Sequence, residues 1–307
     1  MQKPSVSLVI TTFNDAQFLS SALQSSFAQT HPFDEIIVVD DGSTISPEAI
    51  VAEFQGAHFI RQKNAGLSSA RNTGLAAVTS DFVIFLDADD LLLPTAVAEG
   101  LNSHNGHINA AFVYGGYRII SADGNPLTDI IFNDINSSPY SKLLITNYIA
   151  MHATVMYRRQ LLADVGGFDP GLPCCEDYDI YLRIARLYPI FGHHSLIAEY
   201  RHHSSNMTRN YRKMLHWALQ IHLQQTAYLG EFPEAFDCWK AGQRNWRYFY
   251  ASEAFGSALR EYHEQRRLLV VLRFLLMAMK LSLPYTCKRG CKVFSRFMLR
   301  AFFFNSK

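Results

Sequence analysis

Short apolar runs and amphipathic segments alternate over the first two thirds of the chain. Residues 6–10, 36–39 and 82–86 are almost continuously apolar, which is typical of strands buried on both faces of a sheet. Helical periodicity lies between these runs, over 18–27 and again over 67–78. Strands that alternate with helices predict an α/β fold with a doubly wound, mostly parallel sheet. Ligands then bind beyond the carboxyl ends of the strands.

The middle of the chain continues this alternation. We expect strands at 111–114, 154–157 and 197–200, and helices at 158–165 and from 176 onward. The last helix should turn Ile180, Ile184 and Leu187 inward. Residues 121–139 are rich in Asp, Asn, Ser and Pro, so they predict a loop. The α/β domain is predicted to span 1–205.

Residues 206–307 are predicted to form a helical C-terminal region whose character changes near position 265. Arg266, Arg273 and Lys280 recur every seven residues along an apolar helix that Pro284 should end. A second amphipathic helix is expected to place Lys288, Lys292, Arg296 and Arg300 opposite Val293, Phe294, Phe297 and Phe304. No stretch of 18 apolar residues is free of charge, so we do not expect a membrane-spanning helix.

Charge is distributed unevenly, although the 307 residues have a net charge of only +1. Residues 265–307 hold ten Lys and Arg and no Asp or Glu, which leaves 18 basic and 27 acidic residues, a formal −9, in 1–264. A basic amphipathic tail predicts attachment to an anionic membrane surface. Its long apolar faces argue against nucleic acid as a partner. The alternatives are a helical cap packed on the domain and a homodimer interface.

The five cysteines are odd in number and lack zinc-ligand spacing, which fits a reducing compartment. The first apolar run, 6–10, is too short for the core of a signal peptide. We therefore expect a cytoplasmic protein that is peripheral on the inner face of the membrane.

The strand at 82–86 leads directly into three carboxylates, Asp87, Asp89 and Asp90. Carboxylates at the end of a buried strand are costly unless compensated, and Mg²⁺ or Mn²⁺ with a substrate diphosphate would compensate them. Side chains alternate along a strand, so Asp87 and Asp89 should point the same way. One would hold the metal and the other would reach the sugar or ribose. The alternative is a polar turn in which Asp90 caps the next helix and Pro94 lies in its first turn.

The polar residues after the other central strands fit a nucleotide. A carboxylate such as Asp41 can accept the N3–H of uracil or thymine or the N1–H of guanine, which selects against cytosine. Thr12 and Phe13 can supply a hydroxyl and a wall for the base. Arg71 is the natural phosphate or base contact, with a surface ion pair as the alternative. Asn14 itself, or the next residue, should cap the helix over 18–27.

Glycine-based phosphate sites are missing from the sequence. The first strand-to-helix turn lacks G-x-G-x-x-G, and there is no P-loop. We expect Gly42 and Gly66 to permit turns rather than to contact a ligand. Something other than a glycine-lined helix terminus must then hold the phosphates, and a metal at Asp89 would do so.

Four segments occur in order along the chain: VSLVITTFN (6–14), VVDDGST (38–44), NAGLSSARNTG (64–74) and FLDADD (85–90). Together they resemble the family 2 glycosyltransferases, which have the GT-A fold, over about residues 5–205. The resemblance implies an inverting, metal-dependent transfer of a sugar from a nucleoside diphosphate. It places Asp41 at the base, Asp87 at the ribose or sugar and Asp89 at Mn²⁺ or Mg²⁺.

The expected nucleotide-sugar site comprises Thr12, Phe13, Asn14, Asp41, Asn64, Arg71, Asp87, Ala88 and Asp89. The expected nucleotide is UDP, with GDP and dTDP left open.

Inversion requires a base for the acceptor hydroxyl, and Asp177 is the candidate. It lies three residues before Ile180, in the first turn of its helix, and the family pattern places the base at the Glu176-Asp177 pair. For Glu176 the alternative is a favourable interaction with the helix dipole. Asp179 can pair with Arg183 four residues later, so we interpret it as structural.

A Tyr-Arg-x-His stretch of the family matches Tyr200, Arg201 and His203. Arg201 and His203 are expected to contact the leaving diphosphate from a mobile loop, and ordinary surface polarity is the alternative.

The multiple membrane spans and the Gln-x-x-Arg-Trp motif of processive members are not found at the matching place. We therefore expect transfer of one sugar to a hydroxyl of a glycan or lipid-linked acceptor, in cell-surface polysaccharide or glycoconjugate synthesis. The alternative function is a non-catalytic, membrane-associated scaffold that retains the fold.

Overall fold

The computed structural model describes residues 3–131, 137–203, 206–264 and 268–289. The chain divides into two compact units, Met1–Asn206 and Met207–Lys307. Each unit has its own packed interior, so the two are described separately.

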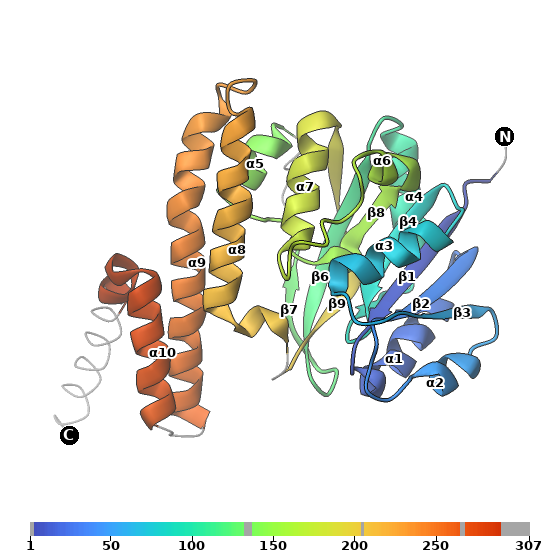
Figure 1. Cartoon of the computed structure of the whole chain (residues 1–307), viewed down its shortest axis with the longest axis horizontal. Helices are drawn as coiled ribbons and strands as arrows, with labels where there is room; N and C mark the ends of the chain where they lie inside the picture. The colour runs from blue at the N-terminus through green and yellow to red at the C-terminus, as the bar shows by residue number, and fades with distance from the viewer. Residues whose placement is uncertain (1–2, 132–136, 204–205, 265–267, 290–307) are drawn as a thin grey trace, which may run out of the picture. The chain divides into compact units, whose positions relative to one another are not determined.

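A mixed sheet of nine strands forms the centre of the first unit (Figure 1). Its strands are β1 (Val6–Thr12), β2 (Glu35–Asp40), β3 (Ala57–Arg61), β4 (Phe82–Asp87), β5 (Leu91–Leu92), β6 (Phe112–Ser121), β7 (Pro126–Ile130), β8 (Val155–Arg158) and β9 (Ile190–His202). The strand order is β3-β2-β1-β4-β8-β6-β9-β5, with β7 paired to β6. The predicted parallel arrangement holds for β3, β2, β1 and β4. Beyond β4 the pairing is mixed, because β8 runs antiparallel to both β4 and β6, whereas β6 and β9 are parallel.

Helices cover both faces of the sheet. They are α1 (Ala16–Phe27), α2 (Glu48–Ala52), α3 (Leu67–Ala77), α4 (Ala96–Gly106), α5 (Pro139–Ile145), η1 (His152–Thr154), α6 (Arg159–Asp164) and α7 (Glu176–Leu187). On one face of β1, Leu8 and Ile10 share a core with Leu19 of α1. On the other face α3 approaches so closely that a side chain at Gly74 would overlap Val9. Burial on both faces explains why β1 is apolar along almost its whole length.

Two expectations about this unit are wrong. The loop predicted over 121–139 contains β7, which pairs with β6. Residues 126–129 of β7 are all exposed, so the strand has no buried face to produce an apolar alternation. Leu187, predicted to face inward, is 58% exposed at the end of α7, whereas Ile180 and Ile184 are buried as expected.

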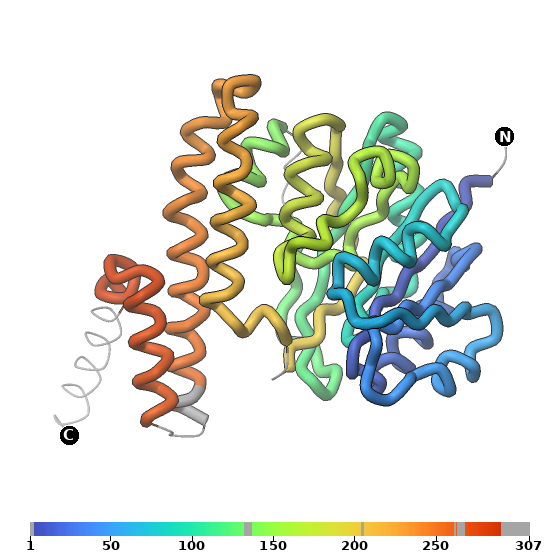
Figure 2. Tube along the Cα trace, in the orientation of Figure 1, coloured from blue at the N-terminus to red at the C-terminus, as the bar shows by residue number. Residues whose placement is uncertain are grey.

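The second unit is helical, with the elements η2 (Met207–Arg209), α8 (Tyr211–Gln224), η3 (Gln225–Tyr228), α9 (Ala235–Glu264) and α10 (Leu268–Leu281). Figure 2 shows α9 running alongside both α8 and α10. The break predicted at Pro284 occurs at Ser282, and Pro284 lies in the first turn of the helical segment 283–289. No helix in the described part of the chain is long and apolar enough to cross a bilayer.

Parts of the predicted tail lie outside the described residues, namely Arg266 and the helix from Lys292 onward. Cys291 also lies there, and the four cysteines that the structure does describe form no disulfide.

Candidate active site

Three polar clusters meet at one edge of the sheet, as the sequence predicted. β1 lies between β2 and β4 and is parallel to both. Thr12 is paired in register with Asp40, and Thr11 with Asp87. The carboxyl ends of three parallel strands therefore deliver hydroxyl and carboxylate groups to the same place.

Asp41 organises the turn that precedes α3. Its Oδ1 accepts hydrogen bonds from Gln62 Nε2 (2.7 Å) and from the N–H of Ala65 (2.9 Å), and its Oδ2 accepts from the N–H of Gly66 (2.9 Å). Oδ2 has one donor and so retains capacity for a second. Gly42 has φ +79°, and a Cβ there would lie 2.7 Å from the backbone nitrogen of Asn64, so glycine is needed for this turn.

The residues expected to line the base divide into two groups. Phe13 is 45% exposed and Asn64 is also exposed, which leaves both accessible to a ligand. The Thr12 hydroxyl is buried and has no hydrogen-bond partner among the described residues. Asn14 has φ +61°, and its Oδ1 accepts from the N–H of Thr44, so it ties two loops together instead of capping α1.

Arg71 links the end of β4 to the start of α7. Its guanidinium is only 2% exposed; Nη2 lies 2.8 Å from Asp87 Oδ1, and Nη1 lies 2.6 Å from Glu176 Oε1. The surface ion pair considered for Arg71 is therefore wrong, because the pair is buried. A phosphate contact by Arg71 stays a prediction. Asp87 also accepts a hydrogen bond from the Thr11 hydroxyl (3.0 Å) and keeps a third of its side chain exposed.

Asp89 lies beyond the end of β4, which stops at Asp87. The strand alternation that was expected to align Asp87 with Asp89 therefore does not apply, because Ala88 and Asp89 form a turn. Asp89 Oδ2 lies 2.9 Å from His203 Nε2 and 3.4 Å from Asn206 Nδ2. This carboxylate is 20% exposed, so one face stays open.

Asp90 and Arg201 hold the turn in place. Asp90 is buried and accepts the N–H of Arg201 (2.9 Å); burial and the charges of Asp89 and Asp87 raise its pKa. The capping role considered for Asp90 is wrong, because α4 begins at Ala96 after Thr95. The side chain of Arg201 donates to the carbonyl of Asp89 (3.0 Å).

Arg201 is not on a mobile loop. It belongs to β9, is 6% exposed, and its guanidinium lies 5.2 Å from the ring of Phe18. The ring of His203 lies against the same phenylalanine at 5.0 Å. The expectation that Arg201 lies on a mobile loop is therefore wrong, because this arginine belongs to β9 and helps to fix the turn that carries Asp89. Its contact with the diphosphate stays a prediction.

Asp177 occupies the first turn of α7 and is half-buried. Burial and the neighbouring charge of Glu176 raise the pKa of Asp177 to about 7, and Arg71 partly offsets this. Its Oδ2 accepts a hydrogen bond from Asn147 Nδ2 (3.1 Å). Asp179, two residues later, forms the expected ion pair with Arg183 at 2.8 Å.

Sequence reasoning missed Asn147 and Asn206 and treated Asp15 only as a candidate helix cap. Asp15 is the N-cap residue of α1, but its side chain makes no capping hydrogen bond, and burial and the charge of Asp89 raise its pKa. Asn147 and Asn206 reach Asp177 and Asp89 from 30 and 117 positions away. No local pattern in the sequence signals such contacts.

Asp89 and His203 together offer an oxygen and a nitrogen donor to a divalent cation. Among the residues that the structure describes, no three His, Cys, Asp or Glu side chains cluster around one point. Mg²⁺ is usually bound through one or two carboxylates, with substrate phosphates and water completing the shell. The partly exposed carboxylate of Asp89 fits that arrangement.

Comparisons with known proteins agree on the family and the fold. The family profile "Glycosyl transferase family 2" matches residues 7–166, just over half of the chain. An "uncharacterized glycosyltransferase" of Rickettsia felis is 30% identical over 208 residues, covering 66% of this chain and 35% of that protein. Chondroitin synthase of Escherichia coli is 31% identical over 190 residues, covering 61% and 27%. The putative teichuronic acid biosynthesis glycosyltransferase TuaG of Bacillus subtilis is 27% identical over 214 residues, covering 68% and 83%. The match thus spans only about a third of the first two relatives.

Two solved structures resemble the chain over nine tenths of its length. TarS 1–349 of S. aureus, in complex with UDP-GlcNAc, has a TM-score of 0.63 at 18% identity and covers 90% of this chain and 81% of its own. The mannosyltransferase PcManGT of Pyrobaculum calidifontis, in complex with GDP-Man and Mn²⁺, has a TM-score of 0.60 at 17% identity and covers 92% and 88%. At these identities the likeness shows a shared fold.

Proposed function

The chain belongs to glycosyl transferase family 2 and has the GT-A fold, and we propose that it transfers one sugar from a nucleoside diphosphate to an acceptor hydroxyl with inversion. The observation that carries this proposal is Asp177. It is a half-buried carboxylate with a pKa of about 7, at the start of the helix whose Glu176 is bridged by Arg71 to Asp87. A general base works best when its pKa lies near the working pH.

In the proposed reaction, Asp177 removes the proton of the acceptor hydroxyl. The acceptor oxygen then bonds to the anomeric carbon as the bond from that carbon to the diphosphate oxygen breaks. Asn147 donates to Asp177 Oδ2 and so orients the carboxylate. The product leaves with inverted configuration because attack and departure occur on opposite sides of the carbon.

The donor side of the site is proposed to hold the nucleotide. Asp41 Oδ2 would accept the imino N–H of the base, Phe13 would supply a wall, and Asp87 would meet the ribose or sugar. Asp89 and His203 would hold Mn²⁺ or Mg²⁺, which when bound stabilises charge on the departing diphosphate. UDP is the proposed nucleotide, in line with the UDP-GlcNAc complex of the neighbouring TarS structure.

The acceptor is proposed to be a glycan or lipid-linked sugar in surface polysaccharide synthesis. TuaG, one of the relatives, is described as a putative glycosyltransferase of teichuronic acid biosynthesis. The basic, apolar helix α10 is proposed to attach the protein to the inner, anionic face of a membrane.

The first test is a thermal-shift screen of UDP, GDP and dTDP with and without Mn²⁺. We expect one nucleotide to raise the melting temperature only with Mn²⁺, and Asp89→Ala to abolish that rise. A scaffold without catalytic function would show no shift with any of the three nucleotides.

A further inference from the structure

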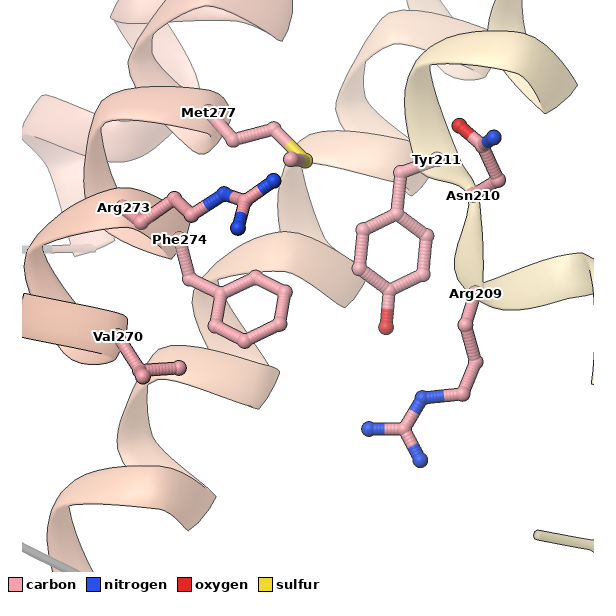
Figure 3. A pocket seen from close by; sticks show the side chains of 7 residues that line it. All are labelled: Arg209, Asn210, Tyr211, Val270, Arg273, Phe274 and Met277. Atoms are coloured by element: carbon pink, nitrogen blue, oxygen red, sulfur yellow. The ribbon is translucent and has the colours of Figure 1, made fainter. Parts of the chain in front are cut away.

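A pocket in the helical unit collects positive charge beside apolar side chains (Figure 3). Its volume is about 410 Å³, within the range of small-molecule sites. It is lined by Arg209, Asn210, Tyr211, Val270, Arg273, Phe274 and Met277. The first three come from η2 and the start of α8, and the other four from α10.

Two guanidinium groups face this pocket without carboxylate partners. Arg209 and Arg273 are both exposed, and neither forms an ion pair with any residue that the structure describes. Figure 3 shows both guanidiniums directed toward the space around the Tyr211 ring. The Tyr211 hydroxyl is 2.8 Å from Ser257 Oγ, so the ring is held as a fixed wall. Exposed guanidinium forks suit the oxygens of a phosphate.

The pocket adjoins an exposed apolar stripe on α10. Leu269 is 84% exposed, Leu272 53% and Leu276 46%. With 3.6 residues per turn, Arg273 lies roughly 40° around the helix from Leu269, between this stripe and the pocket-lining Met277. An in-plane helix with leucines directed into the bilayer would therefore hold Arg273 at the level of the lipid phosphates.

The positive charge of the segment around the pocket favours an anionic ligand in the pocket over a second copy of the chain. Residues 265–307 contain ten Lys and Arg and no Asp or Glu. A second copy of the chain, packed about a two-fold axis on this face, would place like charges against one another. We propose that the pocket binds the phosphodiester of an anionic phospholipid while α10 lies on the bilayer. This inference rests on the proposed membrane attachment and adds a specific headgroup site to it.

The test is binding of the full chain to vesicles of phosphatidylglycerol and phosphatidylcholine, measured by co-sedimentation at fixed ionic strength. Each basic residue near an anionic surface contributes roughly a fivefold change in partitioning. We expect Arg273→Gln to lose clearly more than this, because a pocket contact is lost along with the charge. The matched control is Lys280→Gln, which removes one exposed charge from the same helix, seven residues on, outside the pocket.

The charge-conserving variant Arg209→Lys/Arg273→Lys separates a phosphate site from diffuse attraction. We expect about tenfold weaker binding to phosphatidylglycerol vesicles, because Lys lacks the planar fork. Binding equal to wild type, or equal losses for Arg273→Gln and Lys280→Gln, would overturn the pocket assignment.

Three further results would also overturn it. The first is that the wild-type protein does not bind phosphatidylglycerol vesicles. The second is that soluble glycerol phosphate raises the melting temperature although no vesicles bind. The third is that the protein self-associates and that the arginine variants abolish this self-association. The nucleotide-dependent thermal shift should be unchanged in every pocket variant. If the wild-type protein showed no nucleotide-dependent thermal shift, that result would instead count against the proposed transferase function.

Discussion

The two units of this chain differ in whether their charged side chains form ion pairs. All seven ion pairs found among the described residues lie in the first unit, where Arg71 is 2% exposed between two carboxylates. In the second unit Arg209 and Arg273 are exposed and unpaired, next to leucines that are also exposed. Buried pairs set the geometry of a site and leave little charge for outside partners. Unpaired charge contributes little to folding and remains available to a surface.

The largest effect is expected from replacing Asp177, the carboxylate of the first unit whose pKa is about 7. Asp177→Asn should lower kcat by about 10² to 10⁴, because the acceptor hydroxyl loses its base. Nucleotide binding, measured by calorimetry, should be unchanged. An unaltered kcat would show that Asp177 is only a helix-terminal acid.

Arg71→Met should cause the next largest effect, on stability. It leaves Asp87 and Glu176 without their shared cation, and breaking a buried pair costs about 3–5 kcal/mol. For a unit of this size that lowers the melting temperature by about 10 °C. Calorimetric melting measures it; a shift under about 2 °C would mean that the two carboxylates are not held by Arg71.

The rate of transfer should depend on pH through the ionisation of Asp177. Asp177 acts only when ionised, and its pKa of about 7 lies above the ordinary value, so kcat/KM should fall as pH falls through 7, by about tenfold for each unit below pH 6. Asn147→Ala removes a hydrogen bond that favours the ionised form, so the acid limb should move to higher pH. If the acid limb of the kcat/KM profile lay below pH 5 and Asn147→Ala did not move it, the assignment of Asp177 as the base would be contradicted.

The smallest effect is expected at an exposed pair. Asp129 is 43% exposed beside Arg118, and solvent screens such pairs, so Asp129→Asn should leave the melting temperature unchanged within error. If this variant destabilised the protein as much as Arg71→Met, burial would not be what distinguishes the ion pairs.

Much of the first unit could be predicted because its strands are buried on both faces. β1, β2 and β4 can be recognised in the sequence as apolar runs. Because these strands are parallel neighbours, the polar clusters at their carboxyl ends lie close together. β7 could not be found in this way, because its side chains face solvent. The contacts of Asn147 and Asn206 depend on chain segments that meet only in the folded protein.

Arg201 shows that a motif does not by itself reveal whether a residue lies on a loop or in a strand. In the sequence it lies two residues before His203, and both were expected at the diphosphate. Only the fold shows that β9 continues to His202 and that the guanidinium donates to the Asp89 carbonyl. Both side chains are largely buried, and they differ in their partners: Arg201 donates to the carbonyl of Asp89, whereas His203 lies at the carboxylate of Asp89.

The Arg71 bridge also has a consequence for how the protein is made. Asp87 follows Arg71 by 16 positions, but Glu176 follows it by 105. At ribosomal speeds of about 5–20 residues per second, Arg71 waits roughly 5–20 s for its second partner to be synthesised. During that interval the nascent chain contains Asp41, Asp87 and Asp89, which are proposed to bind the nucleotide and metal, whereas the segment that bears Asp177 has not yet been synthesised.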